Sequence, residues 1–415
     1  MNNIIKELKE LEELVMRCMK CGTCQSVCPL YQKDLVEQSV ARSKIALIES
    51  VYEGRLEDAG KILKYIDYCI LCGRCKANCP SGVKVDEIFL RAKAVLRKIQ
   101  KMKNWQKAVL KIAMEKPELL AKLAPLMHIA LKFSSKKVKR DIFQPLIKEF
   151  SERRVVSIKK EPFTTKFHGL HKAKDEKMRV LFYPGCAVNF IFPKIGESIV
   201  GLLNYCGVSV EVSDTNKCCG IPSASMGDIE LYKKMVNENL DYFDSIKPDY
   251  IITCCPTCEY GLKDLGRRVA NRSSSSELMD ILVFLREVAG LDISTSFNDK
   301  FTLHLPCHYD SSKANVPYEF LKEHIKGVFI PLENQDCCGF GGTFSLKFYK
   351  DSKGISTQKA EEIKAKGIKR VFTPCPGCIM QITDALTTIN CDAEASHPVE
   401  LIYEEIKQEG QFNEK

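Results

Sequence analysis

The sequence predicts a chain of mixed class, α + α/β, in which a helical N-terminal domain precedes a duplicated α/β region with parallel strands. Three observations lead to this prediction. Two four-cysteine runs near the N-terminus are separated by about forty residues with a helical pattern. From Lys177 onwards, strand and helix patterns alternate, which is typical of parallel α/β units. Within that region three cysteine landmarks recur after about 120 residues, which indicates an internal duplication.

We expect four segments, because 415 residues exceed what one hydrophobic core organises. They are a helical domain at 1–100, a basic helical linker or docking segment at 101–176, a first α/β unit at 177–298 and a second at 299–415.

The 21 cysteines are the unusual feature of the composition. The chain is long and rich in lysine, and its first fifteen residues have the pattern of an amphipathic charged helix rather than a signal peptide. This favours metal-bound thiolates in a reducing compartment over disulfides. No apolar run reaches the roughly 18 residues that a membrane span needs. We therefore expect a cytoplasmic protein, either free or held in a complex at the inner face of the membrane.

The formal net charge of +9 counts every thiol as neutral. A four-iron cluster held by four thiolates carries roughly −2 when its core is 2+. Several such clusters would cancel most of the positive charge, so a nucleic-acid partner is not expected.

The two N-terminal runs have the spacing C-x2-C-x2-C-x3-C-P, which is the cluster-binding run of bacterial ferredoxins. Three cysteines of a run can wrap one corner of a four-iron cubane, and the fourth cysteine ligates the other cluster. We predict one [4Fe–4S] cluster on Cys18, Cys21, Cys24 and Cys79 and a second on Cys69, Cys72, Cys75 and Cys28. A pair of zinc knuckles is the alternative, but zinc does not require this spacing twice.

The segment 101–176 contains no cysteine and is strongly basic, since residues 101–175 carry 19 Lys and Arg against 7 Asp and Glu. Residues 105–133 are apolar at helical spacing, with Pro117 and Pro125 as expected breaks. Either two helices pack on the chain's own domains, or residues 101–140 contact a membrane surface or membrane subunit. Residues 134–140 are expected to form a solvated loop whose lysines suit anionic headgroups.

The duplicated region is expected to place its cysteines directly after strands. Cys186 and Cys307, Cys218 and Cys337, and Cys255 and Cys375 are 121, 119 and 120 residues apart. The strands are expected within 178–186, 208–212 and 249–258, and within 301–307, 327–332 and 370–378, with helices at 194–206, 229–243 and 350–366. Because ligands bind at the carboxyl ends of parallel strands, both cysteine sets should gather at that edge.

Each repeat contributes five cysteines: one after the first strand, two in a CCG turn and two in C-P-x-C at a helix start, where thiolates are favoured. The sets are Cys186, Cys218, Cys219, Cys255 and Cys258, and Cys307, Cys337, Cys338, Cys375 and Cys378. Five thiolates exceed what zinc or a simple cubane needs, which favours a larger or irregular cluster in which adjacent thiolates bind different irons. Gly220, Gly339, Gly341 and Gly342 are expected to let the backbone turn tightly and approach a bulky ligand.

Other residues near these motifs have weaker signals. "GFGG" lacks the G-x-G-x-x-G register of a dinucleotide site. Cys206 and Cys391 are expected to be small core residues, and the role of Cys254 is left open. His304 and His308 flank Cys307, and we expect packing or helix-start roles ahead of a role toward a cluster or substrate.

Together these motifs resemble the CCG-domain family of iron–sulfur oxidoreductases. The resemblance covers nearly the whole chain and includes the D-type subunit of heterodisulfide reductase and the iron–sulfur subunits of glycolate oxidase, lactate utilisation systems and anaerobic glycerol-3-phosphate dehydrogenase. The N-terminal part looks like the helical two-cluster domain of succinate dehydrogenase iron–sulfur subunits. The resemblance implies one or two further clusters, noncubane [4Fe–4S], in the CCG units, with zinc as an option in one of them.

The resemblance implies two redox functions. In the heterodisulfide reductase branch, which we favour, the ten CCG cysteines are catalytic and their centres cleave or form a disulfide. In the other branch, the chain relays electrons from a flavin-dependent 2-hydroxyacid or glycerol-3-phosphate dehydrogenase toward quinone. No flavin or nicotinamide motif is visible, so a flavoprotein, or a membrane cytochrome or quinone-reducing subunit, is the expected partner. A structural zinc scaffold is the non-redox alternative.

Overall fold

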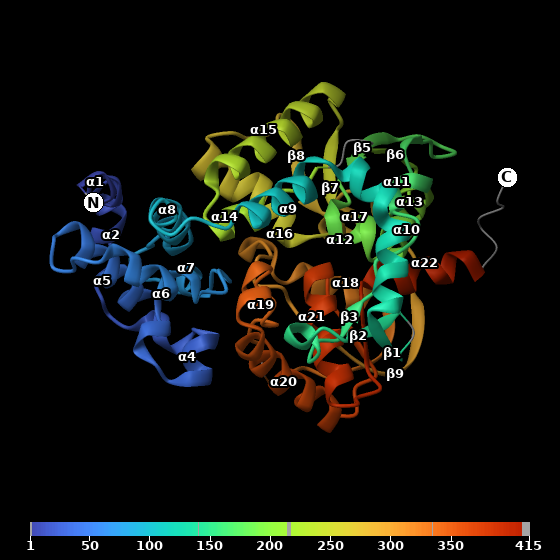
Figure 1. Cartoon of the computed structure of the whole chain (residues 1–415). Helices are drawn as coiled ribbons and strands as arrows, with labels where there is room; N and C mark the ends of the chain where they lie inside the picture. The colour runs from blue at the N-terminus through green and yellow to red at the C-terminus, as the bar shows by residue number, and fades with distance from the viewer. Residues whose placement is uncertain (1, 140, 214–216, 334, 409–415) are drawn as a thin grey trace.

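The fold was analysed in a computed structural model, which describes residues 2–139, 141–213, 217–333 and 335–408. The N-terminal helices form one lobe, and two α/β units lie one above the other beside it (Figure 1). This agrees with the helical and parallel α/β segments expected from the sequence. None of the helices in these residues is both long and apolar enough to cross a membrane.

The N-terminal lobe is built from helices around a core of aliphatic side chains that includes Leu8, Ile48 and Ile88. Its main helices are α1 (Asn2–Lys9), α2 (Glu12–Met16), α5 (Ala41–Tyr52) and α8 (Val85–Leu96). Its short helices are α3 (Thr23–Ser26), α4 (Pro29–Asp34), α6 (Leu63–Asp67), α7 (Arg74–Ala77) and the 3-10 turns Glu37–Ser39 and Ala59–Ile62. The amphipathic pattern at the start of the chain thus folds as two helices rather than one.

The basic segment begins with the two expected helices, α9 (Asn104–Glu115) and α10 (Pro117–Phe133). Pro117 occupies the first turn of α10, where its missing N–H costs nothing. Pro125 was expected to break the helix, which is wrong, because α10 continues through it. Proline has no backbone N–H, so α10 loses one intrahelical hydrogen bond at Pro125. The other hydrogen bonds of this 17-residue helix maintain it.

The expected loop at 134–140 is also wrong for the residues described there. Ser135–Lys139 forms strand β1, which pairs antiparallel with β2 (Ile142–Pro145), and β2 pairs with β3 (Val155–Val156). The side chains of residues 136–139 are exposed, so the lysines sit on the surface of an edge strand, where charge protects the edge from further pairing. A 3-10 turn (Lys148–Phe150), helix α11 (Phe163–Lys166) and strand β4 (Gly169–His171) lead into the first unit.

The first unit contains a five-stranded sheet of order β4-β6-β5-β7-β8. Strands β5 (Met178–Phe182), β6 (Val208–Val212), β7 (Tyr250–Thr253) and β8 (Glu277–Asp280) are parallel, and β4 is antiparallel at the edge. The helices are α12 (Gly185–Phe190), α13 (Pro193–Tyr205), α14 (Ile221–Met226), α15 (Ile229–Ile246), α16 (Pro256–Glu259) and α17 (Ile281–Glu287). Two π-helical turns, Tyr260–Asp264 and Gly266–Ala270, follow α16.

The second unit repeats this topology with the order β10-β9-β11-β12, all parallel. Its strands are β9 (Thr295–Leu303), β10 (Ile325–Phe329), β11 (Arg370–Phe372) and β12 (Glu394–Ser396). A 3-10 turn (Ser311–Lys313) precedes the helices α18 (Val316–His324), α19 (Thr343–Lys347), α20 (Tyr349–Ala365), α21 (Pro376–Thr388) and α22 (Pro398–Gln408). Strand β10 begins two residues earlier than expected, and β9 begins before residue 299, where the second unit was expected to start.

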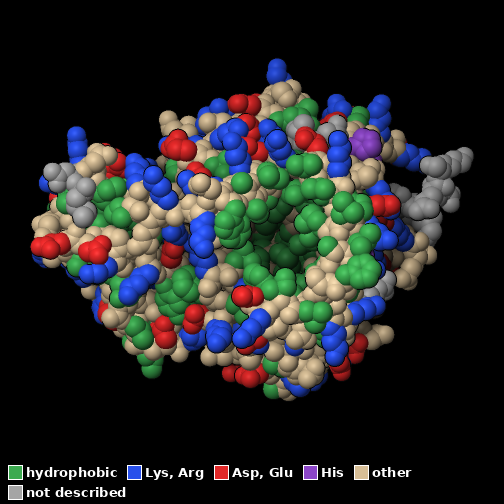
Figure 2. All heavy atoms as spheres, in the orientation of Figure 1, with side chains coloured by type: hydrophobic (Ala, Val, Ile, Leu, Met, Phe, Trp, Pro, Cys, Tyr) green, Lys and Arg blue, Asp and Glu red, His purple; other side chains and the backbone are tan. Residues whose placement is uncertain are grey.

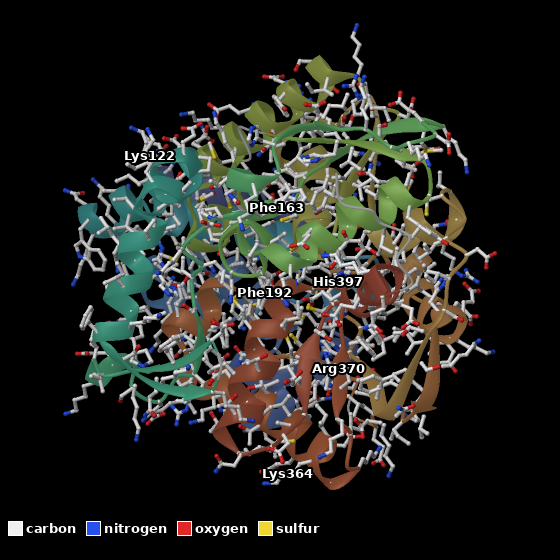
Figure 3. The ribbon with its side chains drawn as sticks, turned by 90° about the vertical axis from the view of Figure 1, so that its right-hand side faces the viewer. Lys122, Phe163, Phe192, Lys364, Arg370 and His397 are labelled. Atoms are coloured by element: carbon white, nitrogen blue, oxygen red, sulfur yellow. The ribbon has the colours of Figure 1, made fainter. Side chains whose placement is uncertain are left out.

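The two units pack as a pseudo-symmetric pair. Helix α13 of the first unit packs on α22 of the second, and α17 of the first packs on α18 of the second. Since α18 occupies the topological position of α13, and α22 that of α17, the two contacts are equivalent, as in a two-fold dimer. One hydrophobic core runs through both units. A Cβ on Gly201 would overlap the ring of Tyr403, so α13 and α22 approach closely. Figure 3 shows Phe192 and His397 near this junction.

Candidate metal centres

Both N-terminal cysteine runs have the same backbone fold. Lys20 and Gly22 in the first run, and Leu71 and Gly73 in the second, have positive φ angles of 55°, 91°, 59° and 73°. This alternation turns successive N–H groups toward one side, where they favour a bound anion. The Leu71 N–H donates to Cys69 Sγ at 3.4 Å. The loops are therefore shaped to surround negatively charged sulfur.

The structure brings the eight N-terminal cysteines together in two small hollows. One hollow is lined by Cys28, Cys69, Cys72 and Cys75. The other is lined by Cys18, Cys21, Cys24 and Cys79, with Cys75 at its edge. The fourth cysteine of each run thus lies with the first three of the other run, which is the arrangement of a two-cluster ferredoxin.

The first α/β unit gathers its five cysteines at the carboxyl ends of its strands, as expected. Cys186 lies at the start of α12, Cys218 and Cys219 precede α14, and Cys255 caps α16, which contains Cys258. Cys218 lies within hydrogen-bonding reach of Cys186 and Cys219. Cys258 lies within reach of Cys219 and Cys255. The five thiols therefore form one connected set.

The second unit gathers its five cysteines in the same way. Cys307 Sγ lies 3.8 Å from Cys337 Sγ, and Cys338 Sγ lies 3.2 Å from Cys378 Sγ. Cys375 caps α21 and contacts Cys378. Nine of the ten cysteines in the two sets are buried or half-buried, and Cys186 is exposed.

The glycines of the two CCG turns have positive φ, 87° at Gly220 and 86° at Gly339. A Cβ on Gly220 would lie 2.7 Å from the ring of Tyr232, and one on Gly339 would lie 2.6 Å from the carbonyl oxygen of Ser352. These glycines therefore let each CCG turn approach the following long helix. Gly341 differs, because its Cβ would lie 2.9 Å from Ile70 of the N-terminal lobe.

Crowding of the thiols alters their acidity. Hydrogen bonds from Cys218 and Cys258 lower the pKa of Cys219 to about 6. Hydrogen bonds from Cys337 and Cys378 hold the pKa of Cys338 well below its usual value. Each unit thus has at least one thiol that favours the thiolate form, which is the form that binds metals. The converging thiols and their close spacing fit an iron–sulfur cluster or a zinc ion in each unit.

The three cysteine-bearing regions contact one another. Cys72 of the N-terminal lobe and Cys337 of the second unit lie in one buried cluster, and Cys337 raises the pKa of Cys72. Cys255 of the first unit acts on Cys375 of the second and lowers the pKa of Cys375. The cysteine groups are therefore linked in the order N-terminal lobe, second unit, first unit, which differs from their order along the chain.

Further contacts dock the N-terminal lobe onto both units. Arg74 pairs with Asp336 beside the second CCG turn at 2.7 Å. His308 Nε2 donates a hydrogen bond to the carbonyl oxygen of Leu71 at 2.8 Å, and its ring stacks on Tyr260. His308 thus has the packing role expected for it.

The remaining cysteines lie in hydrophobic cores, Cys206 and Cys254 in the shared core and Cys391 in the core of the second unit. This confirms the expectation for Cys206 and Cys391. His304 was expected to have a packing or helix-start role, but its ring also lies beside Cys338 and Cys378. The sequence analysis did not single out Lys359, which also lies beside the cysteines of the second unit. The pattern that could have identified it is its helical spacing with Ser352, Ile355 and Ile363, which lie on the buried face of α20.

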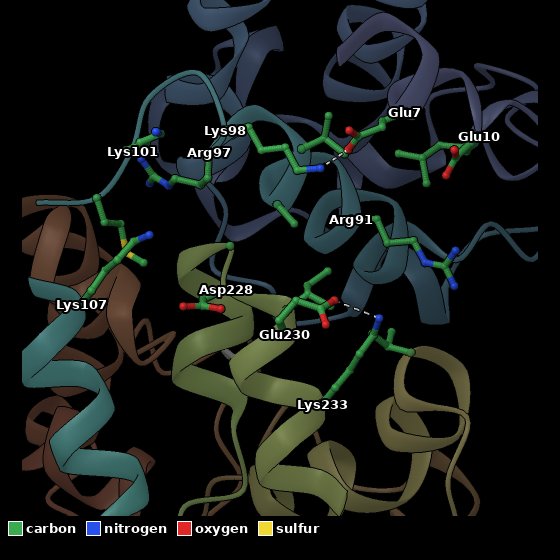
Figure 4. Close-up of a pocket in the computed structure, with 17 residues that line it drawn as sticks. Glu7, Glu10, Arg91, Arg97, Lys98, Lys101, Lys107, Asp228, Glu230 and Lys233 are labelled. Carbon is green, nitrogen blue, oxygen red and sulfur yellow. Dashed lines mark hydrogen bonds and ion pairs between the residues drawn. The ribbon is translucent and has the colours of Figure 1, made fainter. Parts of the chain in front are cut away.

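Two sizeable cavities have no cysteine in their lining. A cavity of about 790 Å³ between the N-terminal lobe and α15 is lined by charges of both signs, with Lys98 paired to Glu7 and Lys233 to Glu230 (Figure 4). A cavity of about 1040 Å³ lies at the junction of the two units, near Phe163 and Arg370 (Figure 3). A smaller one of about 450 Å³ reaches Cys307 and His308.

Comparison with protein families gives the class of this chain. A family model for a 4Fe-4S dicluster domain matches residues 14–83, and a model for the CCG cysteine-rich domain matches residues 180–263 and again 301–383. Together these matches cover more than half of the chain. The chain belongs to the CCG-domain iron–sulfur proteins.

Curated relatives agree with this class. An uncharacterized iron–sulfur protein of Methanocaldococcus jannaschii is 26% identical over 88% of this chain, and the chain spans only 66% of that relative. A probable glycolate oxidase iron–sulfur subunit of Bacillus subtilis is 25% identical, with 87% of this chain and 86% of the relative covered. A subunit of the anaerobic glycerol-3-phosphate dehydrogenase of Escherichia coli K12 is 25% identical, with 84% and 88% covered.

Among solved structures, a hypothetical protein from Helicobacter pylori superimposes with a TM-score of 0.51 at 8% identity. The match covers 97% of this chain and 76% of that one. At this identity the similarity concerns the fold alone.

Proposed function

We propose that the chain is an electron-transferring subunit of an oxidoreductase, of the heterodisulfide reductase D type. Electrons enter through two [4Fe–4S] clusters in the N-terminal lobe and reach centres in the CCG units that cleave or form a disulfide. The observation that carries this proposal is the contact between Cys72 and Cys337, since it joins a proposed ligand of an N-terminal cluster to one of the second CCG centre.

The ligand sets follow from the grouping of the thiols. The N-terminal clusters use the four-cysteine sets given above, and each CCG centre uses its five cysteines, all ten of which we propose as catalytic. The contact between Cys375 and Cys255 then joins the second centre to the first. When bound, iron–sulfur clusters supply one-electron transfer.

Access to the site favours disulfide chemistry at the first CCG unit. Cys186 is exposed at the start of α12. Figure 2 shows an apolar hollow in the region of α9, α10 and α12, and we propose that a substrate enters there. In the reaction the sulfur–sulfur bond of the substrate breaks, two electrons arrive from the N-terminal lobe, and two protons from solvent complete two thiols. The reverse reaction forms the disulfide and returns two electrons.

The second candidate is an electron relay for a flavin-dependent dehydrogenase of a 2-hydroxyacid or of glycerol 3-phosphate, with quinone as acceptor. The names of the Bacillus subtilis and Escherichia coli relatives favour it. The same contacts would serve the relay, with a flavoprotein as the electron donor and no substrate at Cys186.

The basic segment supports a partner at a membrane surface. Trp105, Leu126 and Phe133 of α9 and α10 have exposed fractions of 63%, 63% and 85%, and lysines surround them. We propose that this face rests on an anionic lipid surface. Leu126→Glu should reduce co-sedimentation with anionic vesicles, whereas Val328→Glu, at an exposed apolar site of the second unit, should not. Equal co-sedimentation of the two variants would contradict this placement.

The function can be tested on the anaerobically purified protein. Its iron, sulfide and zinc contents are measured, and EPR spectra are recorded after a thiol is added to the oxidised form. About 16 iron per chain and a new thiol-dependent signal support disulfide chemistry at the CCG units. About 8 to 12 iron, with no response to thiol, would support the relay instead. Purification with a bound flavoprotein would point the same way.

A further inference from the structure

His304 occupies a position that can be compared directly with one in the first unit. His304 precedes Cys307 by three residues, and Tyr183 precedes Cys186 by three. The N–H of His304 donates to the carbonyl oxygen of Phe372 at 2.9 Å, and that of Tyr183 donates to Ile252 at 2.8 Å. Both residues therefore leave the first strand of their unit at the same point beside the third strand.

The side chains at this position differ in their hydrogen bonding. The Tyr183 hydroxyl donates to the carbonyl oxygen of Lys217 at 2.6 Å. His304 is 1% exposed, yet neither of its ring nitrogens has a hydrogen-bond partner among the described residues. A buried imidazole with both nitrogens unpaired is rare, because desolvation of its polar atoms is uncompensated. Such a ring requires a partner that the protein groups around it do not provide.

The surroundings of the ring identify that partner. A ring nitrogen of His304 and the sulfurs of Cys338 and Cys378 all lie within 4.8 Å of one another. Ligand atoms around a four-coordinate zinc or iron ion are about 3.5 to 4 Å apart. The three atoms are thus close to the spacing of three ligands of one metal ion.

We propose that His304 is a ligand of the metal centre in the second CCG unit, bound through a ring nitrogen beside Cys338 and Cys378. The proposal rests on the proposed function only in that this unit holds a metal centre. It makes the two centres chemically different, because the first unit has a tyrosine that is already hydrogen-bonded in place of the histidine.

A second difference between the units acts in the same direction. Gly220 packs on Tyr232 and Met235, and Gly339 packs on Ser352 and Ile355, so the two long helices share a register in which Lys359 matches Asn239. Asn239 donates to the carbonyl oxygen of Cys218, whereas Lys359 is a buried cation whose charge acts on Cys338. The positive charge of Lys359 favours the reduced state of a neighbouring centre, and an added neutral imidazole ligand brings no negative charge. The second centre should therefore accept electrons at a higher potential than the first.

The experiment compares four variants of the full chain purified without oxygen. His304→Tyr installs the residue of the first unit, and His304→Cys offers a different ligand. His128→Gln is the control, because His128 is a buried histidine of α10 that bonds to Ile158 and Ser157. Cys338→Ala reports whether the second unit holds metal at all.

Pulsed EPR of an iron centre should show coupling to a bound nitrogen in the wild type and in His128→Gln, and the coupling should be lost in both His304 variants. If the centre holds zinc, X-ray absorption should show one nitrogen scatterer, replaced by sulfur in His304→Cys. In either case His304→Cys should keep the metal and, for iron, lower the potential. The N-terminal cluster signals serve as the readout of correct folding.

Two results would overturn the proposal in distinguishable ways. If Cys338→Ala lowers the metal content but the nitrogen signal persists in His304→Tyr, the histidine is not a ligand and the proposed function stands. If Cys338→Ala leaves the metal content unchanged, the second unit holds no centre, and both the inference and the disulfide chemistry of that unit fail.

Discussion

The two CCG units share a strand order and a cysteine arrangement, but they differ in what surrounds the cysteines. The second unit receives the N-terminal lobe at Cys337 and buries His304 and Lys359 beside its thiols. The first unit has Tyr183 and Asn239 at the matching positions, each bonded to backbone, and its Cys186 is exposed. The duplication thus gave both units the same cysteine arrangement, whereas the residues around the cysteines differ, and in our proposal they make the second unit the entry point for electrons.

The largest expected effect concerns the order of the centres. Cys338→Ala should remove the second centre, about four iron per chain if it is a cluster. In our proposal this centre passes electrons from the lobe to the first unit, so electrons from the N-terminal clusters should no longer reduce the first centre. Cys219→Ala, the matched change in the first CCG turn, should leave the second centre reducible. Metal analysis and freeze-quench EPR measure both; reduction of the first centre in Cys338→Ala at the wild-type rate would refute this order.

The N-terminal lobe is anchored unequally on the two units. Arg268 of the first unit pairs with Asp86 of the lobe at 2.7 Å, and both side chains are largely buried. Arg268→Ala leaves a buried carboxylate without its main partner, which costs about 3–5 kcal/mol. Arg74→Ala breaks the half-exposed pair with Asp336 in the second unit and should cost about 0–1 kcal/mol. Denaturant unfolding of the two variants gives both values, and equal losses would mean that the anchoring is symmetric.

The pH dependence of the free energy of unfolding should also distinguish the contact between the lobe and the first unit from the interior of that unit. Burial raises the pKa of Glu259, in α16, to about 7. The folded state therefore binds a proton more tightly than the unfolded state, and stability falls as the pH rises from about 4.5 to 7, by on the order of 2–3 kcal/mol. Glu259→Gln should remove this slope when the free energy of unfolding is measured across that range.

Asp86 should have the opposite dependence. Burial opposes its ionisation, but the charge of Arg268 outweighs burial and holds the pKa of Asp86 below its usual value. Its contribution to stability is present above the unfolded pKa and is lost as the pH falls through the folded value. Acid should therefore detach the lobe below about pH 4, and a slope that persists in Arg268→Ala would show that other groups cause it.

The smallest expected effect tests the close approach of the lobe to the second unit. Gly341 and Gly342 both have positive φ, 53° and 54°, and Gly342 has a ψ of −107°, so an alanine strains the backbone at either position. Only Gly341 has Ile70 within reach of a new Cβ, since nothing lies within 4 Å at Gly342. Gly341→Ala should therefore slow reduction of the second centre more than Gly342→Ala. Equal rates would mean that the lobe tolerates the displacement.

Much of the fold follows from the sequence, because its periodicities are local. The offsets between the cysteine landmarks predicted the duplication, and strand and helix patterns placed β6 (Val208–Val212) and α20 (Tyr349–Ala365) within a residue or two. The β1–β2 ribbon was missed because residues 134–140 are dominated by lysine, and their pairing depends on a partner strand rather than on their own composition.

The grouping of the cysteines within each unit was also predictable, since the ends of parallel strands meet at one edge. The links between units were not. Nothing near Cys72 or Cys337 indicates that they meet, because that contact depends on how three separately folded parts pack. The environment of His304 was hidden for the same reason, as its unpaired nitrogens appear only when β9, the second CCG turn and α21 are assembled.

The pseudo-two-fold packing of α13 on α22 and α17 on α18 has a consequence for assembly. In a true homodimer of one CCG unit, any lobe attached to one copy would be attached to both, and every substitution would appear twice. Joining the copies in one polypeptide removes that constraint, since a single lobe serves the pair and each half changes independently. The covalent fusion therefore allows the two halves to take different roles, which a symmetric assembly of identical subunits does not.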